Sequence, residues 1–336
     1  MKEALLYEKL DGLKVKCSLC AHTCVIGNAK RGKCGIRENS DGILYTLIYG
    51  KLCSTAIDPI EKKPLFHFLP SSQTMSIAHV GCNLKCLHCQ NHSISQYPIE
   101  HNGDIAGAIF KPEDVVKAAI DSGCKSISYT YTEPTIGMEF VLDCVKLAHE
   151  NGLKNIFVSN GFMTPKSAQL IIPFLDANNI DLKGDDRFYK DICKARLEPV
   201  KDTIRLMKAK GVWVEITTLI INGLNDSDMT LRAIAEFIHS VDPTIPWHVS
   251  SFRPMYKMTD RPVTSMESLI KAQKIGMETG LKYVYVGNMS GLGGEDTHCP
   301  SCKTRLIKRH GFTVINNIIK GGKCPECGYV VDGKWI

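Results

Sequence analysis

Two kinds of hydrophobic pattern alternate along the middle of this 336-residue chain. Short apolar runs rich in β-branched residues predict strands at 75–80, 126–131, 154–159, 178–182, 212–220, 247–252 and 282–286. Longer segments with apolar residues at helical spacing lie between most of these runs, among them 112–123, 137–152, 227–240 and 265–280. The alternation indicates an α/β protein with a parallel sheet and helices outside it. About six or seven such repeats can close partly into a barrel, and an open doubly wound sheet is the rival arrangement.

Polar residues lie in or after the predicted strands, near where the catalytic loops of parallel barrels lie. Taken singly, each of them is as often a turn or a helix cap as a functional group. Because the strand ends of such a sheet meet at one rim, the whole set predicts an active site there. Its members are Thr130 to Pro134, Ser159 to Gly161, Asp181 to Lys183, Glu215, His248, Arg253 and Asn288.

The loop after the first predicted strand, GCNLKCLHCQN, contains Cys82, Cys86 and Cys89 as a C-x-x-x-C-x-x-C run. Three thiolates at this spacing suit three irons of a cubane [4Fe–4S] cluster. The run has no fourth ligand, so one iron would stay open, as a catalytic metal site requires. The spacing also differs from the C-x-x-C knuckle of structural zinc. The alternative is a chance grouping in a cysteine-rich chain.

A second cysteine set lies near the C-terminus, where C-P-S-C and C-P-E-C-G form two knuckles about twenty residues apart. This spacing is typical of a zinc ribbon with four thiolate ligands in a closed tetrahedral site. A metal would also explain how so short a segment folds, because its own core would be small. Iron in a rubredoxin-like site is the alternative. The ligands would be Cys299, Cys302, Cys324 and Cys327.

A third set, near the N-terminus, consists of Cys17, Cys20, Cys24 and Cys34. Four thiolates suit zinc, which we favour slightly for a small loop-rich lobe, but equally suit an accessory [4Fe–4S] cluster. An accessory cluster would make this lobe an electron relay. The four other cysteines have no partner at ligand spacing, namely Cys53, Cys124, Cys144 and Cys193.

The cysteines divide the chain into three predicted regions. They are a cysteine-rich N-terminal lobe (1–70), a core barrel (71–290) and a zinc-ribbon-like C-terminal lobe (291–336). Gly291, Gly293 and Gly294 indicate a hinge or linker where the last lobe begins. The length fits about two domains, and a hydrophobic content of 44% suffices for a large core.

Composition also bears on location and partners. The 15 cysteines would suit a secreted disulfide protein, but MKEALLYEKLDGLKVK is charged and lacks the apolar segment of a secretion signal. No apolar run approaches the ~18 residues that cross a bilayer, since Glu215 interrupts VWVEITTLII. We therefore expect a cytoplasmic protein whose reduced thiols bind metals. A net charge of +6 without a basic stripe argues against nucleic acid and would help an acidic electron donor dock.

The chain resembles proteins of the radical S-adenosylmethionine (SAM) superfamily. It is similar to the pyruvate formate-lyase activating enzymes and, more narrowly, to the radical SAM proteins of the AmmeMemoRadiSam system. The resemblance covers nearly the whole chain and implies a partial (β/α)6 barrel, a [4Fe–4S] cluster and SAM. It rests on the three cysteine sets and on IEKKPLFHFLP (60–70), YTYTEP (129–134), VSNGF (158–162), IDLKG (180–184), PWHVSSFRP (246–254) and YVYVGN (283–288).

The resemblance also implies roles for individual residues. The cysteines of the C-x-x-x-C-x-x-C run would ligate the cluster, and its open iron would chelate the amine and carboxylate of SAM. The loop with Thr132 and Glu133 would meet the methionine ammonium of SAM. Asp181 and Lys183 match the D-L-K segment at the SAM pocket of the activating enzymes.

Two further residues, Asn160 and His248, lie at strand ends that commonly touch the ribose or adenine of SAM in that group. The chain also departs from the activating enzymes. Thr132-Glu133-Pro134 replaces their Gly-Gly-Glu segment, so backbone contact with the ammonium is in doubt. His88 stands where an aromatic residue near adenine is common, and its imidazole would either stack similarly or be exposed in the loop.

Together these implications predict a radical SAM oxidoreductase. It would cleave SAM reductively to a 5′-deoxyadenosyl radical and abstract hydrogen from an unidentified substrate. Activation of a glycyl radical enzyme is one alternative, which we favour less because two metal lobes would narrow the mouth that a peptide loop needs. A non-catalytic zinc-binding adaptor is the other. The expected partners are a low-potential electron donor such as ferredoxin or flavodoxin and, from the family name, an AmmeMemo protein, with no nucleic acid and no membrane.

Overall fold

The central feature of the computed structural model, which describes residues 1–287 and 294–335, is an eight-stranded sheet in the order β16-β15-β14-β13-β12-β11-β9-β8. Strand β8 (Ser54–Pro59) is antiparallel to β9, and each later pair of neighbours is parallel. The parallel strands are β9 (Gln73–Ala78), β11 (Ser126–Tyr129), β12 (Lys154–Ser159), β13 (Ala177–Asp181), β14 (Trp213–Ile220), β15 (Trp247–Ser251) and β16 (Val284–Gly287). Each of the strands that the sequence predicts in this region is confirmed.

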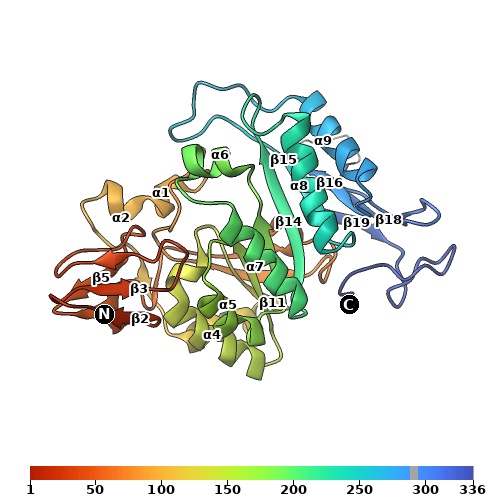
Figure 1. Ribbon diagram of the computed structural model, residues 1–336. Helices are drawn as coiled ribbons and strands as arrows, with labels where there is room; N and C mark the ends of the chain where they lie inside the picture. The colour runs from red at the N-terminus through yellow and green to blue at the C-terminus, as the bar shows by residue number, and fades with distance from the viewer. Residues whose placement is uncertain (288–293, 336) are drawn as a thin grey trace.

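Helices connect successive parallel strands and cover one side of the sheet (Figure 1). In the described part of the chain, the strands at the two edges, β8 and β16, do not pair with each other, so the sheet stays open. This arrangement is the expected partial (β/α)6 barrel. The connecting helices are α3 (Pro112–Asp121), α4 (Met138–Glu150), α5 (Pro165–Ile171), α7 (Glu198–Ala209), α8 (Asp228–Val241) and α9 (Met266–Glu278).

The helices begin where the sequence supplies capping groups. Hydroxyl side chains accept a backbone N–H three residues later at Thr164, Ser227 and Ser265, just before α5, α8 and α9. Pro112 is the first residue of α3, as predicted, because a proline there loses no helical hydrogen bond. The apolar faces of these helices and of the sheet share one core, in which Phe157 and Trp247 are fully buried.

The N-terminal region consists of short antiparallel strands at one side of the barrel (Figure 1). One sheet joins β1 (Lys2–Glu3), β6 (Ile43–Thr46) and β5 (Arg37–Ser40), and another joins β2 (Tyr7–Lys9), β3 (Val15–Cys17) and β4 (Val25–Ile26). Strand β7 (Lys51–Leu52) pairs with β10 (Ala108–Ile109).

The C-terminal region lies at the other side of the barrel and contains the antiparallel strands β17 (Thr297–His298), β18 (Arg305–His310) and β19 (Thr313–Asn317). Its small apolar core includes Tyr283 and Tyr285 beside β16, so the region packs directly on the barrel. Arg309 strengthens the contact by donating to the carbonyl oxygen of Phe66 over 2.8 Å. Of the glycines predicted as a hinge, Gly291 and Gly293 lie outside the described residues, as does Asn288, and Gly294 pairs with β16.

Short helical turns fill the remaining connections. They are η1 (Ile60–Lys62), α1 (His92–Ser95), α2 (Tyr97–Glu100), η2 (Pro134–Gly137), η3 (Ile172–Phe174), α6 (Asp186–Phe188) and the π-helical turn η4 (Tyr189–Cys193). None of the helices in the described ranges has the length and apolar character needed to cross a membrane.

Candidate functional site

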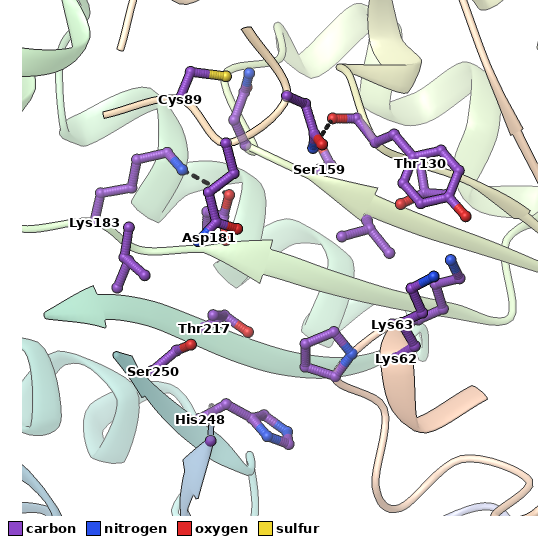
Figure 2. Close-up of a pocket in the computed structure, with 18 of the residues that line it drawn as sticks. Lys62, Lys63, Cys89, Thr130, Ser159, Asp181, Lys183, Thr217, His248 and Ser250 are labelled. Atoms are coloured by element: carbon purple, nitrogen blue, oxygen red, sulfur yellow. Dashed lines mark hydrogen bonds and ion pairs between the residues drawn. The ribbon is translucent and has the colours of Figure 1, made fainter. Parts of the chain in front are cut away.

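A cavity of about 450 Å³ opens along the carboxyl ends of the parallel strands (Figure 2). Its wall contains every residue that the sequence assigns to the cluster or to SAM, namely Cys82, Cys86, Cys89, His88, Thr132, Glu133, Asn160, Asp181, Lys183 and His248. These residues come from the ends of different strands and are far apart in the sequence. The parallel sheet therefore assembles them into one site, as its topology requires.

The three cysteines of the C-x-x-x-C-x-x-C run share the loop that follows β9, here called the cluster loop after the cluster that the sequence predicts. Cys86 is buried, whereas Cys82 and Cys89 are partly exposed. The backbone N–H of Leu84 lies 3.4 Å from the Sγ atom of Cys82, and the hydroxyl of Ser95 lies 3.2 Å from that of Cys89. Hydrogen bonds to sulfur stabilise thiolates, so the loop is prepared for metal ligation.

A fourth cysteine, Cys193, lies beside this loop at the end of η4. The loop is fixed to this turn because the backbone N–H of Lys85 donates to the carbonyl oxygen of Cys193 over 3.0 Å. A hydrogen bond with the Cys193 thiol, together with burial, raises the pKa of Cys86 well above its usual value. The sequence shows no partner for Cys193 at ligand spacing, and spacing along the chain cannot reveal a contact between residues more than a hundred positions apart.

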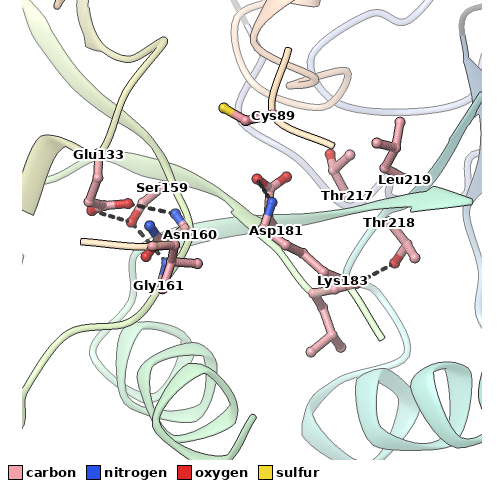
Figure 3. A network of polar contacts seen from close by, with 12 residues as sticks. Cys89, Glu133, Ser159, Asn160, Gly161, Asp181, Lys183, Thr217, Thr218 and Leu219 are labelled. Atoms are coloured by element: carbon pink, nitrogen blue, oxygen red, sulfur yellow. Dashed lines mark hydrogen bonds and ion pairs between the residues drawn. The ribbon is translucent and has the colours of Figure 1, made fainter. Parts of the chain in front are cut away.

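A network around Glu133 joins the ends of β11 and β12 (Figure 3). The buried carboxylate of Glu133 accepts hydrogen bonds from the backbone and hydroxyl of Thr135, the hydroxyl of Ser159 (2.9 Å) and the backbone N–H of Asn160 (2.8 Å). Burial raises the pKa of Glu133, and these donors oppose that rise. The amide of Asn160 in turn donates to Asn83 over 2.7 Å and lies 3.7 Å from the Sγ atom of Cys82. Glu133 therefore orients the cluster loop through Asn160.

The loop after β11 contains a residue in an unusual backbone conformation. Tyr131 has a φ of +64°, which is rare for a bulky residue and is tolerated where the surroundings hold it in place. The side-chain amide of Asn91 donates to the Tyr131 carbonyl over 2.6 Å, and the Thr132 hydroxyl donates to the carbonyl of His79 over 2.8 Å. These bonds fix the Thr132 loop against the cluster loop.

Asp181, the last residue of β13, and Lys183, two residues beyond it, form an ion pair of 2.6 Å on the pocket wall (Figures 2 and 3). Burial alone would lower the pKa of Lys183. Asp181 and the nearby thiol of Cys86 raise it by more than burial lowers it, so the pKa of Lys183 lies above its usual value. Tyr189 holds the turn, since its hydroxyl donates to the Asp181 carbonyl (3.0 Å) and accepts the Lys183 N–H (3.2 Å). The pair gives the pocket one fixed anion and one fixed cation.

His88 is only 4% exposed, which excludes the exposed-loop alternative left open by the sequence. Its ring lies 5.7 Å from that of Phe188, and burial lowers its pKa to about 3. Its Nδ1 atom has no hydrogen-bond partner among the described residues. A buried polar atom without a partner on a pocket wall is a natural contact for a ligand.

His248 lies within β15, as its second residue, rather than at the strand end that the sequence predicts. Its Nε2 atom lies 2.7 Å from the carboxylate of Glu215, which is fully buried and also accepts the backbone N–H groups of Phe66 and His67. Burial raises the pKa of Glu215, but the contact with His248 lowers it, and the net direction is downward. Glu215 therefore lies behind the wall and positions His248. Arg253, also expected at the rim, is exposed and does not line the pocket.

Sequence reasoning missed the opposite wall of the cavity. Lys62 and Lys63 line it, and both are paired with Asp58, at 2.8 and 2.7 Å. Burial lowers the pKa of Lys63 to about 8, although Asp58 opposes this shift. Glu295 and Phe312, from the C-terminal region, also line the pocket. The sequence segment IEKKPLFHFLP could have indicated Lys62 and Lys63, whereas no local pattern marks Glu295 and Phe312.

The terminal cysteine sets lie outside this cavity, on opposite sides of the barrel (Figure 1). The Sγ atoms of Cys299, Cys302, Cys324 and Cys327 all lie within 4.8 Å of one another. The structure thus brings together the two knuckles that the sequence predicts as a metal site. The N-terminal set lies directly beside the cluster loop, since the ring of His22 is 2.8 Å from the carbonyl oxygen of Asn83.

Comparison with known proteins gives consistent results. A family model described as the radical SAM superfamily matches residues 76–238. The uncharacterized protein MJ0808 of Methanocaldococcus jannaschii is 47% identical over 335 residues, which cover 99% of this chain and 99% of that protein. A candidate glycyl-radical enzyme activating enzyme of the same organism, MJ1227, is 27% identical over 181 residues, 52% of this chain and 71% of that protein.

Among solved structures, SuiB of Streptococcus suis bound to S-adenosylmethionine superposes with a TM-score of 0.50 and 13% sequence identity. The superposition covers 68% of this chain and 53% of that chain. At this level of identity the similarity concerns the fold.

Proposed function

The chain belongs to the radical SAM superfamily, and from this premise we propose that it is an enzyme that cleaves SAM reductively and abstracts hydrogen from a substrate in the described pocket. One observation carries the proposal. Every residue that the sequence assigned to the cluster or to SAM lines a single cavity of about 450 Å³. A cavity of this size suits a cosubstrate as large as SAM with part of a substrate beside it.

Membership of the family implies a [4Fe–4S] cluster and SAM, and the residues of the pocket fit both groups. Three thiols on one loop face the cavity, and the buried Nδ1 atom of His88 lacks a partner among the described residues. We assign Cys82, Cys86 and Cys89 as the cluster ligands, which leaves one iron for SAM. Asp181, Lys183, Asn160 and the Thr132 loop would hold SAM, with His88 beside it.

When bound, the cluster and SAM supply a primary carbon radical that takes hydrogen from a nearby C–H bond. The protein must bind, orient and shield these groups. The ion pair of Asp181 and Lys183 offers complementary charges to the ammonium and carboxylate of an amino acid. Apolar side chains of Val158, Leu219 and Phe66 line part of the wall, and in the proposed reaction they would limit the access of water.

For the substrate, we favour a small molecule, or a protein other than a glycyl radical enzyme. Glu295, Gly311 and Phe312 of the C-terminal region line the pocket. In our proposal, this region narrows the mouth of the pocket. A glycyl radical enzyme would have to present its glycine on a peptide loop through that mouth. Its activation is the second candidate, supported by the name of the relative MJ1227. A non-catalytic adaptor explains less well why hydrogen-bonded polar side chains lie behind the pocket wall.

We assign zinc to the C-terminal cysteines. The sulfur–sulfur separations of 3.6 Å (Cys299 to Cys327) and 3.7 Å (Cys302 to Cys324) are close to the ~3.8 Å expected for thiolates about 2.3 Å from a tetrahedral zinc. A radical SAM reaction also needs a reductant, for which we propose a low-potential ferredoxin or flavodoxin. An AmmeMemo protein is a further proposed partner.

The test compares Cys86→Ala with Cys124→Ala in protein reconstituted without oxygen. Cys124 is also buried but lies outside the pocket, so its replacement controls for the loss of a buried thiol. With dithionite and SAM, the control should form 5′-deoxyadenosine and methionine, and Cys86→Ala should form neither and should lose the iron of this cluster. Persistent SAM cleavage by Cys86→Ala would contradict the proposal.

A further inference from the structure

The sulfur atoms of the N-terminal set are spaced differently from those of the C-terminal set. In the C-terminal set they all lie within 4.8 Å of one another, as one tetrahedral ion requires. Of Cys17, Cys20, Cys24 and Cys34, which the structure describes in full, no three have Sγ atoms within 4.8 Å of one another. These four thiols are therefore spaced more widely than the C-terminal four. This spacing favours the cluster over zinc, the two alternatives that the sequence left open.

The four thiols nevertheless face a common space. A Cβ atom placed on Gly32 would lie 3.9 Å from the Sγ atoms of both Cys24 and Cys34. Cys20 is within electrostatic reach of the three other thiols of the set. A cubane binds each thiolate to a different iron, so it holds its ligands around one centre at a wider spacing than a single ion does. We propose that Cys17, Cys20, Cys24 and Cys34 hold a second [4Fe–4S] cluster, which passes electrons to the SAM-binding cluster.

Hydrogen-bond donors surround these sulfurs, as they do in redox-active clusters. The guanidinium of Arg37, only 1% exposed, lies 3.4 Å from the Sγ atom of Cys17. The backbone N–H groups of His22 and Ile36 lower the pKa of the Cys20 and Cys34 thiols, against the larger rise that burial causes. Donors of this kind balance the negative charge of four thiolates and tune the potential of an iron–sulfur cluster.

The N-terminal set is in direct contact with the loop that carries Cys82, Cys86 and Cys89. A Cβ atom on Gly81, whose φ is +96°, would lie 3.1 Å from the carbonyl oxygen of Cys34, so the two backbones touch there. On the other side, the carbonyl oxygen of Phe162 accepts both the N–H of Ala21 (3.2 Å) and the side-chain amide of Asn83 (3.4 Å). One backbone contact and one hydrogen-bonded path thus connect the two cysteine sets.

The charges around the N-terminal set indicate where an electron donor would dock. Lys33, Lys85 and Arg196 lie around His22, next to the N-terminal set, and form a positively charged edge that would attract an acidic donor. The proposed step moves one electron from the reduced second cluster, which returns to its 2+ state, to the SAM-binding cluster, which falls from 2+ to 1+. No bond forms or breaks, and a reduced ferredoxin or flavodoxin supplies the electron.

This inference rests on the proposed function, because a relay needs a SAM-binding cluster to which it can pass electrons. The metal content of the unmodified protein tests the inference and the proposed function separately. After anaerobic reconstitution we expect about eight irons and one zinc per chain, from two clusters and the C-terminal site. About four irons with two zincs would overturn the second cluster and leave the proposed function standing. Protein without any iron would overturn both.

The variant Cys24→Ser locates the second cluster. It should lose about four of the irons and keep a cluster whose electron paramagnetic resonance (EPR) spectrum changes on addition of SAM. The matched control Cys327→Ser should lose zinc and no iron. If the Cys24→Ser variant keeps all its iron, or loses zinc instead of iron, the assignment of a second cluster is overturned.

The relay itself is tested by the choice of reductant. In Cys24→Ser, reduction of the SAM-binding cluster by reduced flavodoxin or ferredoxin should be lost, while reduction by dithionite, a small molecule that needs no docking site, should persist. Equal reduction of Cys24→Ser and the unmodified protein by the protein donor would overturn the relay.

Discussion

The N-terminal and C-terminal regions each present four thiols, yet the structure arranges them in different ways. The C-terminal sulfurs lie within 4.8 Å of one another on a small lobe at the side of the barrel away from the N-terminal region, and two of them are exposed. The N-terminal sulfurs are farther apart, and their region lies against the loop that carries Cys82, Cys86 and Cys89. In our proposal, the same ligand type thus serves a structural purpose in one region and a redox purpose in the other.

The local backbone explains the difference in spacing. The C-terminal thiols come from two tight knuckles that face each other, and in each a backbone N–H returns to the first cysteine's carbonyl oxygen, from Lys303 to Cys299 and from Gly328 to Cys324. The N-terminal thiols come from β3, the turn after it and a separate turn near Gly32. The N-terminal turns also lie against Gly81 and Asn83, beside the cysteines of the C-x-x-x-C-x-x-C run.

The largest expected effect comes from removing a buried ligand of the C-terminal site. In Cys324→Ala we expect loss of zinc and unfolding of the C-terminal region, because metal binding supplies about 10 kcal/mol or more to the folding of such small sites. Limited proteolysis and zinc analysis measure this. Cys124→Ala should cost about 1–2 kcal/mol and leave zinc bound. A C-terminal region that resists protease in Cys324→Ala would break the comparison, because its fold would then not depend on metal.

The next effect concerns the buried ion pair beside the N-terminal set. Arg37 and Glu139 are each only 1% exposed, so Arg37→Met leaves an unpaired buried carboxylate and should cost about 3–5 kcal/mol in the free energy of unfolding. It should also shift the reduction potential of the N-terminal cluster, because a donor to Cys17 is lost. Urea unfolding and a redox titration measure the two.

The exposed ion pair of Lys117 and Asp121 provides the control, since Lys117→Met should cost about 0.5 kcal/mol or less. If Arg37→Met changes stability but not the potential, Arg37 acts on the fold and the sulfur contact has no redox role.

The packing of the C-terminal region on the barrel should make the stability of the protein depend on pH. The contact of this region with the barrel includes fully buried His67, whose Nδ1 atom lies 2.6 Å from the carbonyl oxygen of Asp332. Burial lowers the pKa of His67 to about 4 from its usual 6.5. The unfolded chain therefore binds the proton first, so stability is complete above about pH 6.5 and falls as the pH decreases towards 4, by up to about 3 kcal/mol.

In His67→Gln the stability should depend less on pH between 6.5 and 4, although the variant is less stable at pH 7. Thermal unfolding across this range gives the answer. An unchanged slope in His67→Gln would show that other groups cause the acid sensitivity.

The smallest effect concerns the positively charged edge beside the N-terminal set. Lys33→Glu should slow reduction by an acidic protein donor about 2–5-fold at low ionic strength, with little difference at high salt. Lys320→Glu makes the same charge change on the exposed surface of the C-terminal region and should have no effect. Stopped-flow reduction of the two variants measures this, and equal rates would place the donor elsewhere.

The sequence predicted what depends on local pattern and on motif. The strands of the barrel and Pro112 as the first residue of α3 were correctly placed. The residues that the sequence assigned to the cluster or to SAM all line the pocket, whereas Arg253 does not and His248 lies within its strand. The sequence could not show contacts between distant segments. Cys193 reaches Cys86 across more than a hundred residues, and Phe312 reaches the pocket from another lobe. The spacing of sulfurs in space is likewise invisible in the spacing of cysteines along the chain.

The measurement that tests the account most directly is an EPR titration of the reduced protein with SAM. We expect two cubane signals in the unmodified protein, of which SAM changes only the one that Cys86→Ala removes and Cys24→Ser retains. The absence of any cubane signal, or signals that SAM does not change, would contradict the account.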